Sequence, residues 1–485
     1  MISSVGKYLS ENKWEGHMKI YNTMTKTKED FVPIDKGQIK IYVCGPTVYN
    51  FFHIGNARPF VVFDTLRKYL EYRGHNVKYV QNFTDVDDKI INRAKEEGIS
   101  AEAVGEKYIE EYYKDAAALN VKKADVHPKV TETMTEIIEF VQGLIDKGYA
   151  YETEGDVYYS TKKFKGYGKL SRQNIEELEV GARIETTEKK KDPLDFALWK
   201  ARNADDEIAW DSPWGQGRPG WHIECSAMAK KHLAETIDIH AGGQDLAFPH
   251  HENEIAQSEA QNGKTFAKYW MHNGYITIDN EKMSKSRGNF FMVRDILKEY
   301  DGEVMRFFLL SGHYRNPINF SDTLMDQAKN SLARIQNAKN NLKHLMETGS
   351  EQITETEKAE YEKFNVHRDN FITAMDDDLN TADAITAVFE LITAINTAVK
   401  NGASKEFAEK SLKFLEELTG VLGLLQDNED SADNDIEEGI AALIEERQQA
   451  RKEKNFARAD EIRDILKARG ITLKDTPQGV QIIKE

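Results

Sequence analysis

The sequence has 485 residues, 40% of them hydrophobic and 30% charged, with a formal net charge of −17. The length predicts several domains, and the acidic balance excludes a protein that coats nucleic acid without sequence preference. No apolar run is long enough to cross a bilayer, no secretory core begins the chain, and two cysteines are too few for a disulfide framework. We therefore expect a cytoplasmic protein with no membrane association.

The first elements of the chain predict an α/β fold. Apolar runs over 39–45 and 77–83 are typical of buried strands. Between them, the spacing of apolar residues predicts a helix that follows Gly55 and ends at Gly74. Strand, helix and strand in this order imply a right-handed crossover and a parallel sheet.

Later segments predict an interrupted sheet followed by helices. Helices are expected over 101–119 and 129–147, and further strands over 237–242 and 274–279. From about residue 292 the pattern is helical, and apolar residues between Ala384 and Ile395 recur at spacings of three and four. We predict these segments: an N-terminal extension 1–17, a first catalytic half 18–148, a connective insertion 149–205, a second catalytic half 206–291, a helical region 292–425, an acidic linker 426–440 and a small C-terminal domain 441–485.

The tetrapeptide His53-Ile54-Gly55-Asn56 lies where a predicted strand gives way to a helix. A helix start offers free N–H groups and a positive dipole end to a phosphate. Gly55 permits close approach of a nucleotide, and the His53 imidazole can donate a hydrogen bond to charge that forms on phosphorus. Alone, this short motif is a weak indication of nucleotide binding.

A second motif, Lys282-Met283-Ser284-Lys285-Ser286, strengthens that interpretation. Two lysines among small hydroxyl residues suit a departing pyrophosphate, because lysine is a mobile point charge. The structural alternative is a solvated surface turn, which the combination with the upstream tetrapeptide disfavours.

The two cysteines belong to a possible metal site. Cys44, Cys225, His250 and Glu254 would supply two thiolates, an imidazole and a carboxylate, a set that suits zinc. His250 and Glu254 are four residues apart, so one helical face can present both. The alternatives are inert packing of each cysteine, a polar helix start at residues 250–254, and His251 as the ligand in place of His250.

The two phosphate motifs resemble the signatures of class I aminoacyl-tRNA synthetases. The resemblance implies a Rossmann-like parallel-sheet catalytic domain with a connective insertion, followed by a helical bundle and a small C-terminal domain. It also implies catalytic roles for His53, Asn56, Lys282 and Lys285, and ATP binding by His53, Gly55, Asn56 and Lys285. The chain departs from the usual pattern at Asn56, which replaces a second histidine and cannot carry its positive charge.

Further motifs resemble the cysteinyl-tRNA synthetase family, and they occur in its order: YVCGPTVY, HIGN, NFTDVDDK, WHIECSAM, FPHHENE and KMSKS. The resemblance runs from about Lys19 to the C-terminus and implies the substrates ATP, L-cysteine and tRNA(Cys), one zinc ion on the four ligands above, and magnesium with ATP. It places Gly45, Thr84, Trp221 and Asp245 in the amino-acid pocket, although Trp221 could be a core residue and Asp245 a turn former. A zinc ion would select a thiol over the hydroxyl of serine.

The resemblance also implies that residues 300–425 dock tRNA and that the C-terminal unit reads the anticodon. Within that unit we expect residues 451–463 to form a contact surface, with an ordinary charged helix as the alternative. By analogy with the family, the protein would be a monomer. Three other functions stay open here: a cysteine ligase that acts on an amino sugar, another class I synthetase such as the methionyl enzyme, and a non-catalytic tRNA-binding protein.

Overall fold

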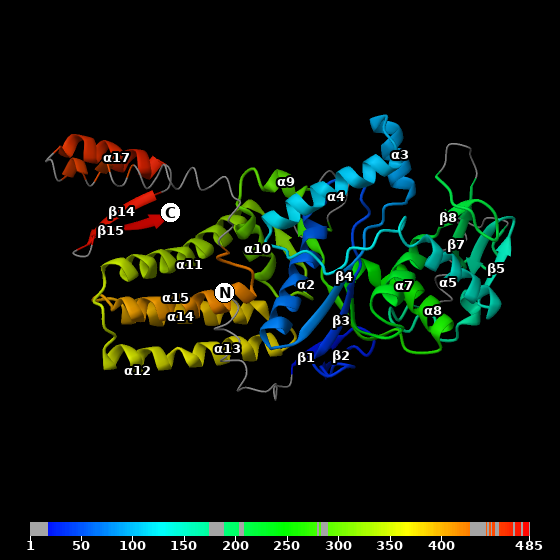
Figure 1. Ribbon diagram of the computed structural model, residues 1–485, viewed down its shortest axis with the longest axis horizontal. Helices are drawn as coiled ribbons and strands as arrows, with labels where there is room; N and C mark the ends of the chain where they lie inside the picture. Colours follow the sequence, from blue (N-terminus) through cyan, green and yellow to red (C-terminus); the bar gives the residue numbers. More distant parts are fainter. Residues whose placement is uncertain are drawn as a thin grey trace. The chain divides into compact units, whose positions relative to one another are not determined.

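The computed structural model describes residues 18–173, 189–202, 208–278, 281–282 and 290–426, some residues between 443 and 451, and the stretches 455–468, 471–476 and 479–484. The chain divides into two compact units (Figure 1). The first comprises the described residues up to Asp301 together with Gly312–Phe320 and Asp376–Asn380. The second comprises Gly302–Ser311, Ser321–Met375 and the described residues from Thr381 onward. Among the described residues, no helix has the length and apolar character that a membrane span requires.

A four-stranded parallel sheet forms the centre of the first unit. Its strands have the order β10-β9-β3-β4 and are β3 (Gln38–Val43), β4 (Asn76–Gln81), β9 (Ile237–Gly243) and β10 (Ala267–Asn273). The chain passes from β3 through α2 (Ile54–Tyr72) to β4 on one side, whereas β9 pairs with the other side of β3. Open α/β sheets bind ligands at the carboxyl ends of strands where the order reverses in this way. The predicted α/β fold is confirmed.

The remaining strands of this unit correct two expectations. The segment expected at 274–279 is β11 (Ile276–Ile278), which pairs with β12 (Glu281–Lys282) and β13 (Ile318–Phe320) in a separate sheet. The fourth parallel strand is instead β10. The sequence analysis did not predict it, because the buried end of this strand carries the polar residues His272 and Asn273. The strand β13 also lies within the region 292–425 that was predicted to be helical.

Helices cover the sheet and extend from it. They are α3 (Asp88–Glu97), α4 (Ala101–Ala118), α5 (Met134–Asp146), α7 (Trp221–His232) and α8 (Glu252–Asn262), with the short α9 (Val293–Ile296); β1 (Lys19–Asn22) and β2 (Thr27–Asp30) form a hairpin. The helix expected from residue 129 begins at Met134. Residues 128–131 are engaged elsewhere, since Pro128 accepts from the Phe83 N–H and Thr131 donates to Asp85.

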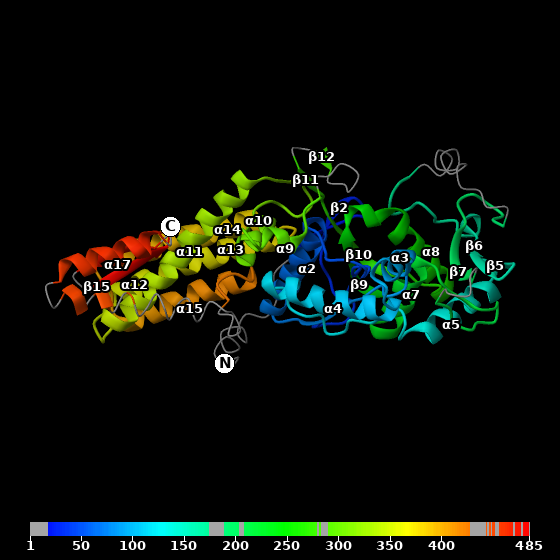
Figure 2. The same ribbon diagram turned by 90° about the horizontal axis from the view of Figure 1, so that it is seen from above.

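The predicted insertion contributes three strands to an antiparallel sheet of order β5-β6-β7-β8, whose strands are β5 (Ala150–Thr153), β6 (Asp156–Tyr159), β7 (Phe196–Ala201) and β8 (Gly217–Pro219). Helices α5, α7 and α8 lie beside it in both ribbon views (Figure 2). Because β8 pairs with β7, this sheet runs past residue 205, where the insertion was predicted to end. The pairing joins the insertion directly to the start of α7.

The second unit is mainly helical. Its helices are α10 (Gly302–Leu310), α11 (Asp322–Thr348), α12 (Glu355–Lys363), α13 (Asn365–Asp376), α14 (Thr381–Ala398), α15 (Lys405–Val421) and α17 (Phe456–Ala468), followed by the hairpin of β14 (Ile471–Thr476) and β15 (Gly479–Lys484). The amphipathic stretch Ala384–Ile395 lies within α14, and most of its apolar side chains are buried, whereas Phe389 is half-buried. The expected N-terminal extension 1–17 and almost all of the acidic linker 426–440 lie outside the described residues.

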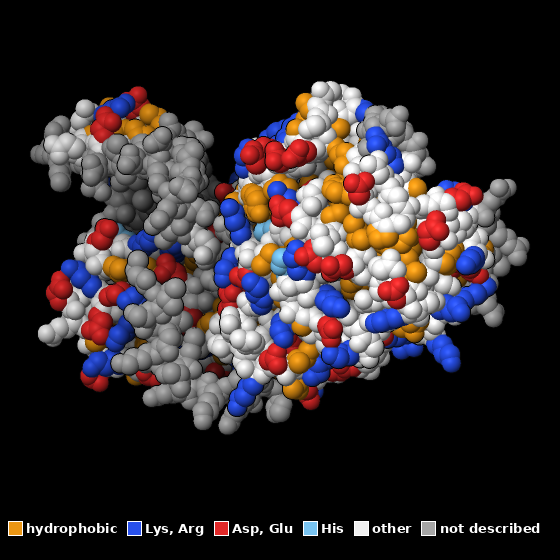
Figure 3. Space-filling model, turned by 45° about the vertical axis from the view of Figure 1, so that its right-hand side comes forward, with side chains coloured by type: hydrophobic (Ala, Val, Ile, Leu, Met, Phe, Trp, Pro, Cys, Tyr) orange, Lys and Arg blue, Asp and Glu red, His pale blue; other side chains and the backbone are white. Residues whose placement is uncertain are grey.

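On the surface drawn in Figure 3, the charged side chains of the described residues do not form separate acidic and basic regions. Acidic and basic side chains are interspersed on this face, with hydrophobic side chains exposed between them. On the face that this view shows, the described residues form no continuous basic surface.

Asp378 lies in the segment Asp376–Asn380, which belongs to the first unit although it is distant in sequence from the rest of that unit. Replacing Asp378 should destabilise the unit. Its buried carboxylate accepts hydrogen bonds from the Tyr21 N–H, the Tyr314 hydroxyl and Arg315 Nε at 2.7–2.8 Å. Asp378→Asn removes the charge and should cost about 2–3 kcal/mol, because charge-assisted buried hydrogen bonds are the strong ones. Urea unfolding followed by circular dichroism measures the loss.

The neighbouring Asp377 provides a matched control. Its side chain is 55% exposed and pairs with Lys28 at 2.6 Å. Exposed pairs contribute little, so Asp377→Asn should change the unfolding free energy by less than ~1 kcal/mol. Equal effects of the two substitutions would contradict the role given to Asp378.

Candidate active site

Four donor side chains from distant parts of the chain meet at the carboxyl edge of the parallel sheet. Cys44 directly follows β3, Cys225 lies on α7, His250 lies in the turn η4 (Ala247–His251), and Glu254 lies in the first turn of α8. One donor atom from each lies within 4.8 Å of the others, and all four residues are buried. The sequence analysis predicted that these residues come together, and they do.

The distances among these atoms fit one tetrahedral zinc ion. Ordinary zinc bond lengths place two sulfur ligands about 3.8 Å apart, and a sulfur and an oxygen ligand about 3.6 Å apart. The sulfurs of Cys44 and Cys225 are 3.9 Å apart, and Cys44 Sγ is 3.5 Å from Glu254 Oε1. His250 Nε2 lies 3.0 Å from the same oxygen, a hydrogen-bond distance that is about 0.4 Å shorter than zinc bond lengths give for these two ligands. Two sulfurs, one nitrogen and one oxygen are also a donor set that zinc accepts.

A second donor set shares two of these residues: Cys44, His240, His251 and Glu254 also lie within 4.8 Å of one another. His251 Nε2 is 3.3 Å from Cys44 Sγ, so the alternative of His251 as a ligand has geometric support. The first set is favoured because it uses both thiols. In it, His240 Nε2 holds the other carboxylate oxygen of Glu254 at 2.8 Å, as outer partners of metal ligands do.

The electrostatics of the cluster favour anionic donors. The hydrogen bond from Cys44 lowers the pKa of the Cys225 thiol to about 6, whereas burial raises the pKa of Cys44 well above its usual value. Burial opposes the ionised form of Glu254, but His240 and His250 lower the pKa of this carboxyl group to about 2. A buried cluster with a thiolate and a carboxylate is most stable when it holds a cation.

The phosphate motif forms a helix start. His53 is the N-cap of α2, and its Nδ1 accepts a hydrogen bond from the Asn56 N–H at 3.3 Å. Gly55 and Asn56 occupy the first turn. The Ile54 N–H donates to the Phe291 carbonyl, and the Val293 N–H donates to the Phe52 carbonyl, both at 3.1 Å. These bonds tie the helix start to the segment that follows the lysine motif.

The lysine motif is described only at its first residue. Lys282 ends β12, and only its backbone is described. Lys285 lies outside the described residues. Their roles therefore stay predictions.

The four residues expected in the amino-acid pocket have different environments. Gly45 and Thr84 follow β3 and β4 and are joined through Asn82, which accepts from the Gly45 N–H at 2.9 Å and donates to Thr84 Oγ1 at 3.3 Å. Trp221 begins α7, is 43% exposed, and lies against the His250 ring with centroids 4.5 Å apart. Its exposure argues against the alternative of a core residue. Asp245 is exposed in the turn after β9.

Sequence reasoning missed several residues around the cluster. Asn82 Oδ1 is 3.8 Å from Cys225 Sγ, Glu224 accepts from the Thr84 hydroxyl, and His222 Nδ1 is 2.9 Å from His250 Nδ1. His272 Nε2 faces His251 Nδ1 at 2.8 Å. A usable signal was the presence of polar residues at the ends of buried strands, as in IDIH and YWMHN, because a buried polar group requires a partner.

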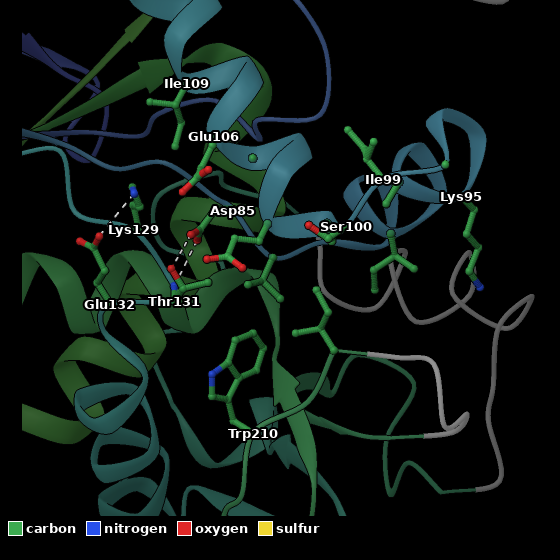
Figure 4. Close-up of a pocket in the computed structure, with 18 residues that line it drawn as sticks. Asp85, Lys95, Ile99, Ser100, Glu106, Ile109, Lys129, Thr131, Glu132 and Trp210 are labelled. Carbon is green, nitrogen blue, oxygen red and sulfur yellow. Dashed lines mark hydrogen bonds and ion pairs between the residues drawn. The ribbon is translucent and has the colours of Figure 1, made fainter.

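A separate cavity of about 970 Å³ in the same unit contains none of the predicted site residues. It lies between α3, the start of α4 and the segment around Trp210, and Figure 4 shows Asp85 bonded to Thr131 on its wall. Apolar side chains such as Ile99 and Ile109 alternate there with acidic ones such as Glu106. Among the described residues that line the cavity there is no metal donor cluster, so the cavity does not alter the assignment of the site.

Three family models match the chain. The class I (C) tRNA synthetase catalytic domain matches residues 30–330, the DALR domain matches 370–426, and the cysteinyl-tRNA ligase anticodon-binding domain matches 433–482. The cysteine–tRNA ligase of Clostridioides difficile (strain 630) is 60% identical over 466 residues, which cover 96% of this chain and 99% of that protein. The chain belongs to the cysteine–tRNA ligase family.

Solved structures of other class I synthetases share the fold of this ligase. Mycobacterium tuberculosis methionyl-tRNA synthetase with methionyl-adenylate has a TM-score of 0.57 at 12% identity, over 79% of this chain and 89% of that one. The ternary complex of Agrobacterium radiobacter K84 agnB2 LeuRS with tRNA and LeuAMS has a TM-score of 0.57 at 12% identity, over 81% and 85%. At this identity, the likeness concerns the fold alone.

The comparisons bear on the alternatives that the sequence left open. The match to an anticodon-binding domain at residues 433–482 favours a tRNA ligase over a ligase that acts on an amino sugar. The full-length match to a cysteine–tRNA ligase disfavours the methionyl alternative and a non-catalytic protein. The domain boundaries given above stay predictions.

Proposed function

We propose that this ligase activates cysteine with ATP to cysteinyl-adenylate and transfers the cysteine to the 3′-terminal adenosine of tRNA(Cys). The observation that supports this most strongly is the meeting of Cys44, Cys225, His250 and Glu254 at the carboxyl edge of the sheet, because Cys44 directly follows β3, the strand that precedes the predicted phosphate-binding helix α2. A thiol substrate and a phosphate-bearing substrate can then be held on either side of the segment between β3 and α2.

We propose that these four residues hold one zinc ion. Bound there, zinc would supply a Lewis acid that lowers the pKa of a substrate thiol and prefers sulfur to the oxygen of serine. His240 and His222 would orient Glu254 and His250. Trp221, half exposed and tilted against the His250 ring, would cover the bound amino acid. Gly45, Thr84 and Asp245 would complete the pocket.

On the ATP side, His53, Gly55 and Asn56 would bind the phosphates at the start of α2. The positive end of the helix dipole stabilises negative charge on the phosphates. The carboxylate of cysteine attacks the α-phosphorus, and Lys282 and Lys285 would stabilise the departing pyrophosphate. We expect magnesium to arrive with ATP, because this ion usually bridges phosphates and few protein ligands.

The second unit would bind tRNA. Its helices from α10 to α15 would dock the molecule, and the C-terminal unit would read the anticodon, where unpaired bases expose their edges. The segment 451–463, partly described as α17, carries the charged surface that we expect to make contact. We propose a cytoplasmic monomer, by analogy with the family.

Cobalt substitution and pyrophosphate exchange test the central proposal together. The zinc-depleted protein should lose cysteine-dependent ATP–pyrophosphate exchange and regain it with zinc. In the cobalt-substituted protein, cysteine should alter the visible absorption, because cobalt bands report a new thiolate ligand, and serine should not. If the visible absorption changes with neither amino acid, or changes equally with cysteine and serine, selection through sulfur is refuted.

A further inference from the structure

The segment that follows the lysine motif lies antiparallel to the residues that lead into α2. His53 and Met292 form an isolated antiparallel bridge, and the Phe290 ring meets the His53 ring edge to face, with centroids 4.5 Å apart. Together with the two backbone hydrogen bonds described above, these contacts place residues 290–293 directly beside the start of α2. Two segments that are distant in sequence therefore meet on the proposed ATP side of the site.

Arg294 joins both of these segments to α4. Its guanidinium group lies over the face of the Phe51 ring, with the central carbon 3.3 Å from the ring centroid. Its Nη2 donates to Glu111 at 2.6 Å and to both carboxylate oxygens of Asp115 at 3.2 Å. Glu111 and Asp115 are four residues apart on α4, so one helical face presents both. The Phe51 ring also packs edge to face on Tyr108 of the same helix, with centroids 5.2 Å apart.

The chemistry of this contact requires an arginine. Asp115 is 5% exposed, and among the described residues Arg294 is the only cation that forms an ion pair with it. A buried carboxylate without a cation is costly, so the pair is hard to separate. A guanidinium group is planar and carries several N–H donors, so it can stack on a ring and bond two carboxylates at once, which the point charge of a lysine cannot.

We propose that Arg294 is a positioning residue for cysteine activation. It fixes the helix start at His53 and the segment after the lysine motif in one arrangement against α4. When the cysteine carboxylate attacks the α-phosphorus and pyrophosphate departs, the roles predicted for His53 and for the lysine motif require that both segments are aligned with one triphosphate. Misplacement of such groups by about 1 Å can cost about a hundredfold in rate. This inference rests on the proposed function and adds a residue outside both phosphate motifs.

The variant Arg294→Met tests the inference, because it keeps a long apolar side chain near Phe51 and removes the charge with its hydrogen bonds. In cysteine-dependent ATP–pyrophosphate exchange, kcat should fall about tenfold to a hundredfold, the effect of misaligned groups. The KM for cysteine should stay within about twofold of the wild-type value, because Arg294 contacts Phe51, Glu111 and Asp115 and none of the proposed metal ligands.

The two steps of the reaction distinguish positioning from a general loss of structure. The lysine motif would act on the departing pyrophosphate, which takes part only in activation. Once the enzyme-bound adenylate has been formed and isolated, single-turnover transfer of cysteine to tRNA(Cys) by Arg294→Met should therefore proceed within about twofold of the wild-type rate. Both rates are referred to the concentration of sites that hold adenylate, so unfolded protein does not enter the comparison.

Lys298→Met is the matched control. Lys298 lies four residues beyond Arg294, and its side chain is 73% exposed and pairs with Asp295 at 2.7 Å. Exposed pairs of this kind contribute little, so this variant should activate and transfer cysteine at wild-type rates.

Two results would overturn the inference while the proposed function stands. One is an unchanged kcat for pyrophosphate exchange in Arg294→Met, and the other is an equal slowing of activation and transfer. A wild-type protein that shows no cysteine-dependent exchange would instead overturn the proposed function, and this inference with it.

Discussion

Cys225→Ser should lower zinc affinity by about two to three powers of ten and abolish cysteine-dependent pyrophosphate exchange at ordinary zinc concentrations. The binding free energy of a four-ligand zinc site is ~10–16 kcal/mol, and one ligand supplies roughly a quarter of it. Serine keeps the shape of the side chain but replaces a soft thiolate with a poorly ionised hydroxyl. Zinc titration with a colorimetric chelator and the exchange assay measure the two effects.

His251→Asn is the informative comparison, because His251 belongs only to the second donor set. If the first set binds the metal, His251 is an outer partner, and its loss should cost at most about a hundredfold in affinity. Cys225→Ser should then be the more damaging change. Zinc retention by Cys225→Ser together with zinc loss by His251→Asn would assign the metal to the second set.

Gly45→Ala should lower kcat/KM for cysteine by about tenfold to a hundredfold and reduce thermal stability. A Cβ atom at this position would lie 1.6 Å from the Asn82 carbonyl oxygen, which is backbone and cannot swing away. The ends of β3 and β4 would have to separate, and overpacking of this kind costs ~1–3 kcal/mol or more. The shift would move Cys44 and weaken the bond from the Gly45 N–H to Asn82. Steady-state kinetics and thermal unfolding measure the two effects.

Gly420→Ala provides the control, since it makes the same chemical change in open space. Gly420 lies inside α15, and the nearest atom to an added Cβ would be 3.8 Å away. Replacing a glycine inside a helix should stabilise the protein by about 0.5–1 kcal/mol without affecting kinetics. Wild-type kinetics in Gly45→Ala would refute the steric argument.

The sequence by itself determined the chemistry of this protein. The two cysteines, the His250–Glu254 spacing and the HIGN tetrapeptide specify thiolate, imidazole and helix-start groups whatever the fold. The strand–helix–strand order at β3, α2 and β4 was also readable, because local periodicity and the glycine after the helix depend only on neighbouring residues.

Only the tertiary structure decided which groups meet. Cys44 and Cys225 are 181 residues apart, and their contact at 3.9 Å depends on β9 pairing with β3, which no local pattern encodes. The hydrogen bond between His240 and Glu254, and those that connect Gly45, Asn82, Thr84 and Glu224, likewise join residues from different elements and were not predicted from the sequence. Local forces set the elements, whereas the order of strands reflects the burial of the whole core, so the outer partners of the site become visible only once that core is assembled.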